Sequence, residues 1–237
     1  FPYVISNGQN LMVWYSLLWN NGGDLFDENW NPIFNNKEGV EATQRYVDFL
    51  LKDKIMVPSA ITMTEGDANY EMLQGRAAMS ITWSWYYDKY LDSKQAVPGV
   101  LKNAGISTIP TYTGQDDPIT YACNFGISIS KDSKNQGAAW EYLKFVSSKE
   151  IEKEIVIDKS DPLTASVVTM HNSNLLDEEV NNANDGLQKI TYEVLKTSRT
   201  LPFVPQWLQI QSVLEIAMNK MASGDPVQST LDQAAAD

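Results

Sequence analysis

The sequence predicts an α/β fold. Helical periodicity alternates along the chain with short apolar segments of the length of buried strands, and this alternation is typical of α/β proteins. The segments expected to form strands are 77–83, 105–110 and 125–130. The segments expected to form helices are 11–20, 35–54, 65–74, a stretch around 138–146, 187–195, 206–221 and 226 to the end.

Start and stop signals support these helices in order. The first is expected to stop at Asn20, where the following glycines supply a left-handed exit. Either Asn35 or Asn36 can cap the second helix. Three acidic residues at 177–179 are typical of the first turn of a solvated helix, where negative charge suits the helix dipole. Asp225 followed by a proline predicts the start of the last helix.

Composition narrows the function classes. The chain has 237 residues, long enough to bury a sizeable core, and a net charge of −12. Such a charge repels phosphate backbones, and no Lys/Arg cluster offsets it, so nucleic acid is not expected as a partner. No apolar run reaches the roughly 18 residues that a membrane span needs.

The chain offers little for catalysis or metal binding. Cys123 is the only cysteine and His171 the only histidine, which excludes an intramolecular disulfide and a Cys-rich zinc site. A nucleophilic triad would have to use His171, which we expect at the surface. The acidic segment 24–30 lacks the ligand pattern of a calcium loop. We therefore expect no catalytic residue, no metal and no cofactor.

Four segments, taken in order, carry a resemblance. They are 19–26 (Trp-Asn-Asn-Gly-Gly-Asp-Leu-Phe), 73–81 with the tryptophans that follow, 109–110 with 126–145, and 205–207 with 222–226. Each is weak alone, but their order and spacing are specific and cover nearly the whole chain. The sequence resembles the family 1 extracellular solute-binding proteins, the group that contains maltose-binding protein.

The resemblance implies a periplasmic-binding-protein-like fold of two lobes that close on a ligand like a hinge. It implies that residues 1–121 and 167–237 form the C-terminal lobe. Segment 122–166 would then belong to the N-terminal lobe, with hinge crossings near 121–124 and 163–168. On this interpretation the chain is a C-terminal fragment of a longer protein.

The function that the resemblance implies is binding of a sugar or oligosaccharide outside the cytoplasm and its delivery to the permease subunits of an ABC transporter. The protein would be extracellular or periplasmic, with a lipoprotein anchor at a missing N-terminus as one form of attachment. It would not be an enzyme. Two alternatives stay open: a fragment of a carbohydrate-active enzyme, or the same fold with a non-sugar polar ligand.

Sugar-binding clefts combine aromatic planes, which stack on C–H patches of the sugar, with polar groups that pair its hydroxyls. The chain has 7 Trp and 11 Tyr, although such residues also fill cores. The resemblance favours Trp85 at the end of the segment 77–83 as a stacking residue. Further ligand-binding candidates are Trp207, Trp14, Tyr121, Trp83, Asn124, Arg199 and Asn10.

The chain taken alone is expected to bind sugar poorly, because a clamp buries its ligand between two lobes. An apolar strand edge and helix stripe in 125–146 would also lack most of their packing partners. This predicts disorder, self-association or strand exchange with a second copy. The alternative is a stable subdomain in which 122–166 folds back on the main lobe.

Overall fold

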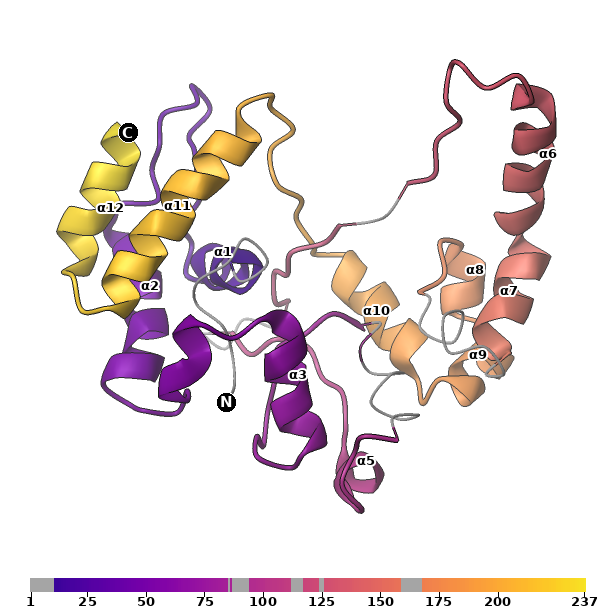
Figure 1. Cartoon of the computed structure of the whole chain (residues 1–237), viewed down its shortest axis with the longest axis horizontal. Coiled ribbons are helices and arrows are strands. Elements are labelled where there is room, and N and C mark those ends of the chain that lie inside the picture. Colours follow the sequence, from indigo (N-terminus) through magenta and orange to yellow (C-terminus); the bar gives the residue numbers. More distant parts are fainter. Residues whose placement is uncertain (1–10, 85, 87–93, 112–116, 124–125, 159–167) are drawn as a thin grey trace.

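The computed structural model describes residues 11–84, 86, 94–111, 117–123, 126–158 and 168–237. Figure 1 shows the helices in two groups, one around α1 and one around α7. The helices among these residues are α1 (Leu11–Asn20), α2 (Lys37–Leu51), the 3-10 helix η1 (Pro58–Ile61), α3 (Glu65–Leu73), α5 (Val100–Asn103), α6 (Gln136–Val146), α7 (Lys149–Ile157), α8 (Asn172–Leu175), α9 (Glu178–Ala183), α10 (Leu187–Leu195), α11 (Trp207–Ala222) and α12 (Val227–Ala236).

The first group is built around α1, a helix whose residues are nearly all buried. α1 packs against α2, and α11 and α12 pack against each other and against α2. A helix that is apolar on every side must be covered on every side, which explains its central place. The core joins α1 to α11 through residues such as Leu18, Leu214, Met218 and Met221.

Local sequence signals place α2 and its approach to the core. Asn36 caps the helix, because its side chain accepts a hydrogen bond from the backbone N–H of Gly39 at 2.8 Å. A Cβ at Gly39 would lie 2.0 Å from the carbonyl oxygen of Phe34, so a larger residue cannot fit there. Gly39 therefore lets the first turn of α2 approach the preceding segment closely.

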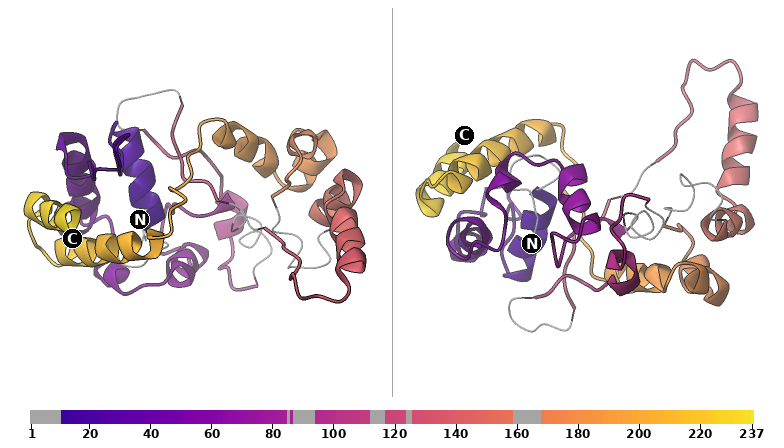
Figure 2. Two further views of the ribbon diagram at one scale, coloured as in Figure 1. Left: turned by 90° about the horizontal axis from the view of Figure 1, so that it is seen from above. Right: turned by 60° about the horizontal axis from the view of Figure 1, so that its bottom comes forward.

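The second group contains α6 to α10. α7 contacts α9, α10 contacts both α8 and α9, and α6 contacts α7. Four of these helices each bury an aliphatic side chain: Val156, Leu175, Val180 and Leu187. Helices α8, α9 and α10 therefore pack against one another, and α9 joins them to α7. The division into 1–121 with 167–237 and 122–166 stays a prediction. Figure 2 shows the two groups of helices from two further directions.

The expected strands do not form ladders. Among the described residues, β-pairing is limited to two isolated bridges, Phe26 with Pro32 and Tyr121 with Arg199. Segments 77–83, 105–110 and 126–130 have no strand assignment, so that expectation is wrong for them; Phe125 lies outside the described residues. A strand requires a partner for its N–H and C=O groups. Neither of the two bridges among the described residues involves these three segments.

None of the described helices has both the length and the apolar character required to cross a membrane.

Candidate aromatic binding site

Three aromatic side chains of helix α1 point in two directions. Tyr15 and Trp19 are four residues apart and lie on one face, with stacked rings whose centroids are 6.0 Å apart. Trp14 instead points toward α2, where its Nε1 donates a hydrogen bond to Thr43 Oγ1 at 2.8 Å.

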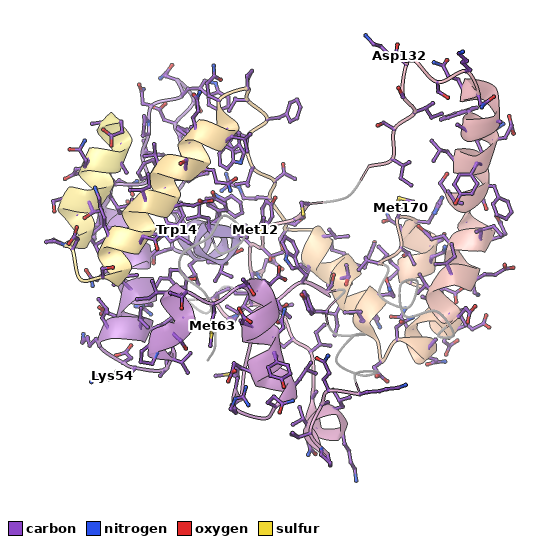
Figure 3. The ribbon with its side chains drawn as sticks, viewed as in Figure 1. Met12, Trp14, Lys54, Met63, Asp132 and Met170 are labelled. Atoms are coloured by element: carbon purple, nitrogen blue, oxygen red, sulfur yellow. The ribbon has the colours of Figure 1, made fainter. Side chains whose placement is uncertain are left out.

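Trp14 is therefore a core residue, and the expectation that it faces a ligand is wrong. It is 0% exposed and packs edge-on against Phe34 at 6.4 Å. Figure 3 shows it inside the group formed by α1, α2 and α11. The physical reason is the helical period: α1 has to bury one side against α2, and Trp14 lies on that side.

Polar side chains of α1 hold the segment that carries Tyr121. Asn20 Nδ2 donates to the carbonyl oxygen of Ile119 at 2.6 Å, and Asn20 Oδ1 accepts from the N–H of the same residue at 2.9 Å. Ser16 Oγ accepts from the N–H of Tyr121 at 3.1 Å. The helix thus satisfies backbone groups that a neighbouring strand would otherwise satisfy.

On its other side this segment pairs with the stretch before α11. The N–H of Arg199 donates to the carbonyl oxygen of Thr120, and the N–H of Ala122 donates to that of Arg199, both at 2.9 Å. This short parallel bridge brings together two parts of the chain that are far apart in sequence. It places Tyr121 and Arg199 beside the C-terminal end of α1.

Tyr15 is the centre of an aromatic cluster, which we define as Tyr15, Trp19, Trp83, Tyr121 and Trp207. Its ring lies 6.3 Å from Tyr121 and 6.1 Å from Trp207, and Trp83 meets Tyr121 edge-on at 5.8 Å. These centroid distances are in the range of favourable aromatic pairs. Trp83, Tyr121 and Trp207 are half-buried. Part of each therefore remains accessible to a ligand.

Charged groups border the cluster on the Trp19 side. The Arg199 guanidinium lies over the Trp19 ring, 5.0 Å from its centroid, and forms an ion pair with Asp24. Asp24 Oδ1 in turn accepts from Trp19 Nε1 at 3.3 Å. The Arg199 side chain is 42% exposed, so the guanidinium retains access to solvent. A guanidinium stacked on indole is an attractive cation–π arrangement.

The hydroxyl of Tyr15 is buried and has no hydrogen-bond partner among the described residues. Burial, together with the nearby Tyr121 and Glu215 side chains, strongly raises the pKa of Tyr15. Burial, with a smaller effect from Cys123, raises the pKa of Tyr121 to about 12. Both phenols are therefore neutral in neutral solution, where each can donate and accept a hydrogen bond. An unpaired buried hydroxyl costs about 1–3 kcal/mol, so a polar partner here would be stabilising.

Four of the candidates from the sequence thus come together: Trp83, Tyr121, Arg199 and Trp207. Trp85, Asn124 and Asn10 lie outside the described residues. Sequence reasoning missed Tyr15 and Trp19 as members of the cluster. Their four-residue spacing within a largely apolar helix was the available signal, since it puts two aromatic rings on one face.

A cavity of about 180 Å³ lies near the cluster but is distinct from it. It opens between α11, α12 and the loop before α2, and its lining is mostly apolar, with Phe34, Ile210 and Leu214 among its residues. Within the aromatic cluster Tyr15 and Trp19 are buried, whereas Trp83, Tyr121 and Trp207 are half-buried. The three half-buried rings are therefore the part of the cluster that a ligand can reach.

The remaining polar cluster ties the second group of helices together. Glu152 of α7 is buried, and its carboxylate accepts from His171 Nδ1 at 2.9 Å and from Asn174 Nδ2 at 2.8 Å. It also accepts from the N–H groups of Met170 and His171. The expected surface histidine is thus partly exposed and hydrogen-bonded. The described residues contain no cluster of three or more His, Cys, Asp or Glu side chains suited to a metal ion.

The family model for bacterial extracellular solute-binding proteins matches residues 2–153. This match covers more than half of the chain. The chain therefore belongs to the bacterial extracellular solute-binding protein family, as the resemblance in the sequence implied.

Several solved structures share the fold of this chain. Maltose-bound MalE3 of T. maritima superposes with a TM-score of 0.82 at 18% identity, over 97% of this chain and 56% of that one. A solute-binding protein of Agrobacterium radiobacter K84 in complex with ribitol superposes with a TM-score of 0.80 at 26% identity. The superposition covers 99% of this chain and 57% of that one. The maltotriose-bound MalE domain of Bdellovibrio bacteriovorus superposes with a TM-score of 0.75 at 19% identity. The superposition covers 99% of this chain and 58% of that one.

These likenesses show the two-lobed fold of periplasmic binding proteins, as expected, although the described part of this chain is rich in helices. The chain spans between 56% and 58% of the length of the three structures.

Proposed function

We propose that the natural protein containing this chain captures a sugar or oligosaccharide outside the cytoplasm and delivers it to the permease of an ABC importer. Family membership supports the class, because this is a family of extracellular solute-binding proteins. The observation that carries the ligand class is the aromatic cluster, in which Tyr121 and Trp207 contact Tyr15 and Trp83 contacts Tyr121, beside the Arg199–Asp24 ion pair.

This arrangement suits carbohydrate chemically. The ring faces of Trp83 and Trp207 offer apolar planes for the C–H patches of a sugar, while Arg199 and Asp24 offer a donor and an acceptor for its hydroxyls. Trp85 belongs to the same surface in this proposal, because only Ser84 separates it from Trp83. Asn124 and Asn10 supply further polar contacts.

The mechanism is binding and closure of two lobes without covalent chemistry. The proposed hinge begins after Tyr121. The Asn20 and Ser16 side chains hold the residues just before it against α1, through the backbone N–H groups of Ile119 and Tyr121. A firmly held segment on one side and a change of helix group on the other is the arrangement that a hinge requires. The ligand and the permease both contact the closed form of the protein.

A thermal-shift screen of the intact natural protein tests the proposal. The panel contains mono- and oligosaccharides, polyols, amino acids, polyamines and short peptides, and glycosides are followed for turnover. We expect at least one sugar or polyol to raise Tm in a concentration-dependent way without being hydrolysed. A shift produced only by peptides or polyamines, or turnover of a glycoside, would reject the proposal.

A further inference from the structure

The loop between α1 and α2 holds a tryptophan in a strained and exposed position. Trp30 has a φ of 65°, in the left-handed region that disfavours a side chain of this size, and it is 57% exposed. Its ring lies 5.8 Å from the ring of Phe26. A glycine would adopt this backbone conformation without strain and would leave no indole in water. The stability of the loop therefore does not explain the tryptophan, and strain of this kind is typical of a functional position.

Side-chain and backbone hydrogen bonds make this loop rigid. The Asp27 carboxylate accepts from the backbone N–H groups of Asn29 and Asn31, both at 2.8 Å, and from Asn31 Nδ2 at 2.8 Å. The Asp27 N–H donates to the carbonyl oxygen of Asn31 at 3.0 Å. An antiparallel bridge joins Phe26 to Pro32 at the base of the loop. A rigid loop presents its indole to a partner with little loss of conformational entropy.

An apolar groove begins at the base of the same loop. It is the cavity of about 180 Å³ between the loop, α11 and α12, and its lining includes Phe26, Pro32, Ile210, Val213 and Ala234. Figure 1 shows the loop beside the N-terminal end of α11. We call the exposed indole and this groove the Trp30 surface. An exposed aromatic anchor beside a small pocket is typical of the centre of a protein–protein interface.

The charges at the Trp30 surface are negative. Glu28 lies in the same loop as the indole and is exposed, and the exposed Asp237 is the charged residue among the described residues that line the groove. Segment 24–34 contains no lysine or arginine. A basic partner would pair with these carboxylates and could place a cation over the indole. An anionic lipid surface, or a second copy with the same carboxylates, would be repelled.

Helix α11 joins the Trp30 surface to the aromatic cluster. Trp207, in the first turn of α11, contacts Tyr15 in the cluster at 6.1 Å. Ile210 and Val213, one turn further along, line the groove. A partner seated in the groove would therefore pack on the helix that carries a proposed ligand contact. This position suits the partner that receives the ligand.

We propose that the Trp30 surface is where the permease of the importer docks, through a segment that carries an apolar side chain flanked by lysine or arginine. The groove and the indole take the apolar side chain, and Glu28 and Asp237 pair with the cations. This inference rests on the proposed function and adds the docking surface that this chain contributes.

Uptake measurements with the intact natural protein test the docking surface. Right-side-out membrane vesicles of the source organism, freed of this protein and loaded with ATP, receive purified protein and the radiolabelled sugar identified by thermal shift. In Trp30→Gly we expect the protein concentration for half-maximal uptake to rise at least fivefold. Sugar affinity, measured by calorimetry, should stay within twofold, and Tm should stay the same or rise, because glycine suits a φ of 65°.

Lys54→Gly is the matched control for this substitution. Lys54 is also exposed and has a φ of 54°, and Figure 3 shows it in a different loop of the same helix group. The same relief of strain at Lys54 should leave the concentration for half-maximal uptake unchanged.

A charge reversal tests the basic character of the partner. Glu28→Lys should raise the concentration for half-maximal uptake at least threefold at low salt, and the difference should shrink in high salt because salt screens exposed charges. Asp53→Lys is its control, since Asp53 is exposed and precedes Lys54 in the distant loop. Equal effects of the two reversals would contradict a basic partner at this surface.

The outcomes separate this inference from the proposed function. Unchanged half-maximal uptake in Trp30→Gly overturns the inference while sugar binding and uptake by the natural protein stand. Weaker sugar binding in Trp30→Gly would assign the indole to the ligand site, and a dimer that this variant dissolves would assign it to a second copy; either result overturns the inference. If Trp30→Gly does not fold, the two charge reversals decide. A natural protein that binds no sugar and supports no uptake would overturn both claims.

Discussion

Asn20 and Ile119 are joined by two hydrogen bonds, one in each direction between the side-chain amide and the backbone. The amide of Asn20 therefore replaces one residue of a neighbouring strand. Asn20 is the last residue of α1, and its Nδ2 also donates to the Ser16 carbonyl oxygen at 2.7 Å. This single residue fixes the end of the helix and the start of the proposed hinge.

Asn20→Ala is expected to destabilise the first group of helices by about 1–3 kcal/mol, because it leaves the backbone groups of Ile119 without partners. Urea unfolding of the intact protein measures the change. Asn103→Ala is the control, since Asn103 is exposed and its side chain donates to the carbonyl oxygen of Gly99, four residues earlier in the chain. Equal stability of the two variants would show that the paired bonds contribute nothing.

Trp207→Ala is expected to affect sugar binding, whereas Trp14→Ala is expected to affect the stability of the fold. Trp207 is half-buried in the aromatic cluster, so its loss should weaken sugar binding by about 1–3 kcal/mol with a small change in Tm. Trp14 is buried against Phe34 and Thr43, so its loss should destabilise the fold by about 3–5 kcal/mol. Calorimetry and thermal unfolding are measured on both. If Trp207→Ala mainly lowered stability and Trp14→Ala mainly weakened sugar binding, Trp207 would be the core residue and Trp14 the ligand-binding residue.

Trp85→Ala is expected to weaken sugar binding by about 1–3 kcal/mol with little loss of stability, as for removal of a stacking anchor. Trp85→Phe, which keeps an aromatic plane, should recover part of the affinity. Titration and thermal unfolding of the intact protein check both variants. A variant that binds normally but melts much earlier would identify Trp85 as a core residue.

The helices were predictable from the sequence, whereas the pairing of distant segments was not. The expected bounds of α1 and α10 agree with the structure. Glu178 and Glu179 lie in the first turn of α9 as expected, while Asp177 is its N-cap. These features depend on neighbours three or four residues away. The bridge between Tyr121 and Arg199 depends on two segments 78 residues apart in the numbering. An apolar segment alone does not specify such a partner.

The site was predictable to a similar degree. Three of the candidates chosen from the sequence lie in one aromatic cluster, in which Tyr121 contacts both Tyr15 and Trp83, and Trp207 contacts Tyr15. Their role in ligand binding stays a prediction. The expectation for Trp14 was wrong, because the contact of α1 with α2 covers it. Trp19 is nearly as buried, at 4% exposed, so neither tryptophan of α1 is open to solvent. The orphaned Tyr15 hydroxyl has no signature in sequence at all.

Alkaline solution is expected to destabilise the protein through Tyr121. Its folded-state pKa is raised to about 12, above the ordinary value of 10.0. Below pH 10 the phenol is neutral in both states. As the pH rises further, the unfolded chain loses this proton first, so stability falls between about pH 10 and 12. Urea unfolding at pH 8.5, 10 and 11 follows the loss. Tyr121→Phe should give a shallower decline, and an unchanged slope would contradict the assignment.

The chain of 237 residues, prepared by itself, is expected to self-associate and to bind sugar poorly. Helix α6 has no buried residue, and it stands away from α1 and α2 rather than folding back on them. Tyr142 and Phe145 lie three residues apart on one face and are 64% and 58% exposed. Apolar side chains in such a patch favour association with another copy.

Light scattering and calorimetric titration on one sample measure both properties of the isolated chain. Tyr142→Ser combined with Phe145→Ser should shift it toward the monomer without restoring sugar binding, because a single wall leaves most of the ligand in water. Leu208→Ser is the control, since Leu208 is an exposed apolar residue of α11 outside this patch. A monomeric chain with the full affinity of the intact protein would show that the described part is sufficient for binding and that the α6 face needs no cover.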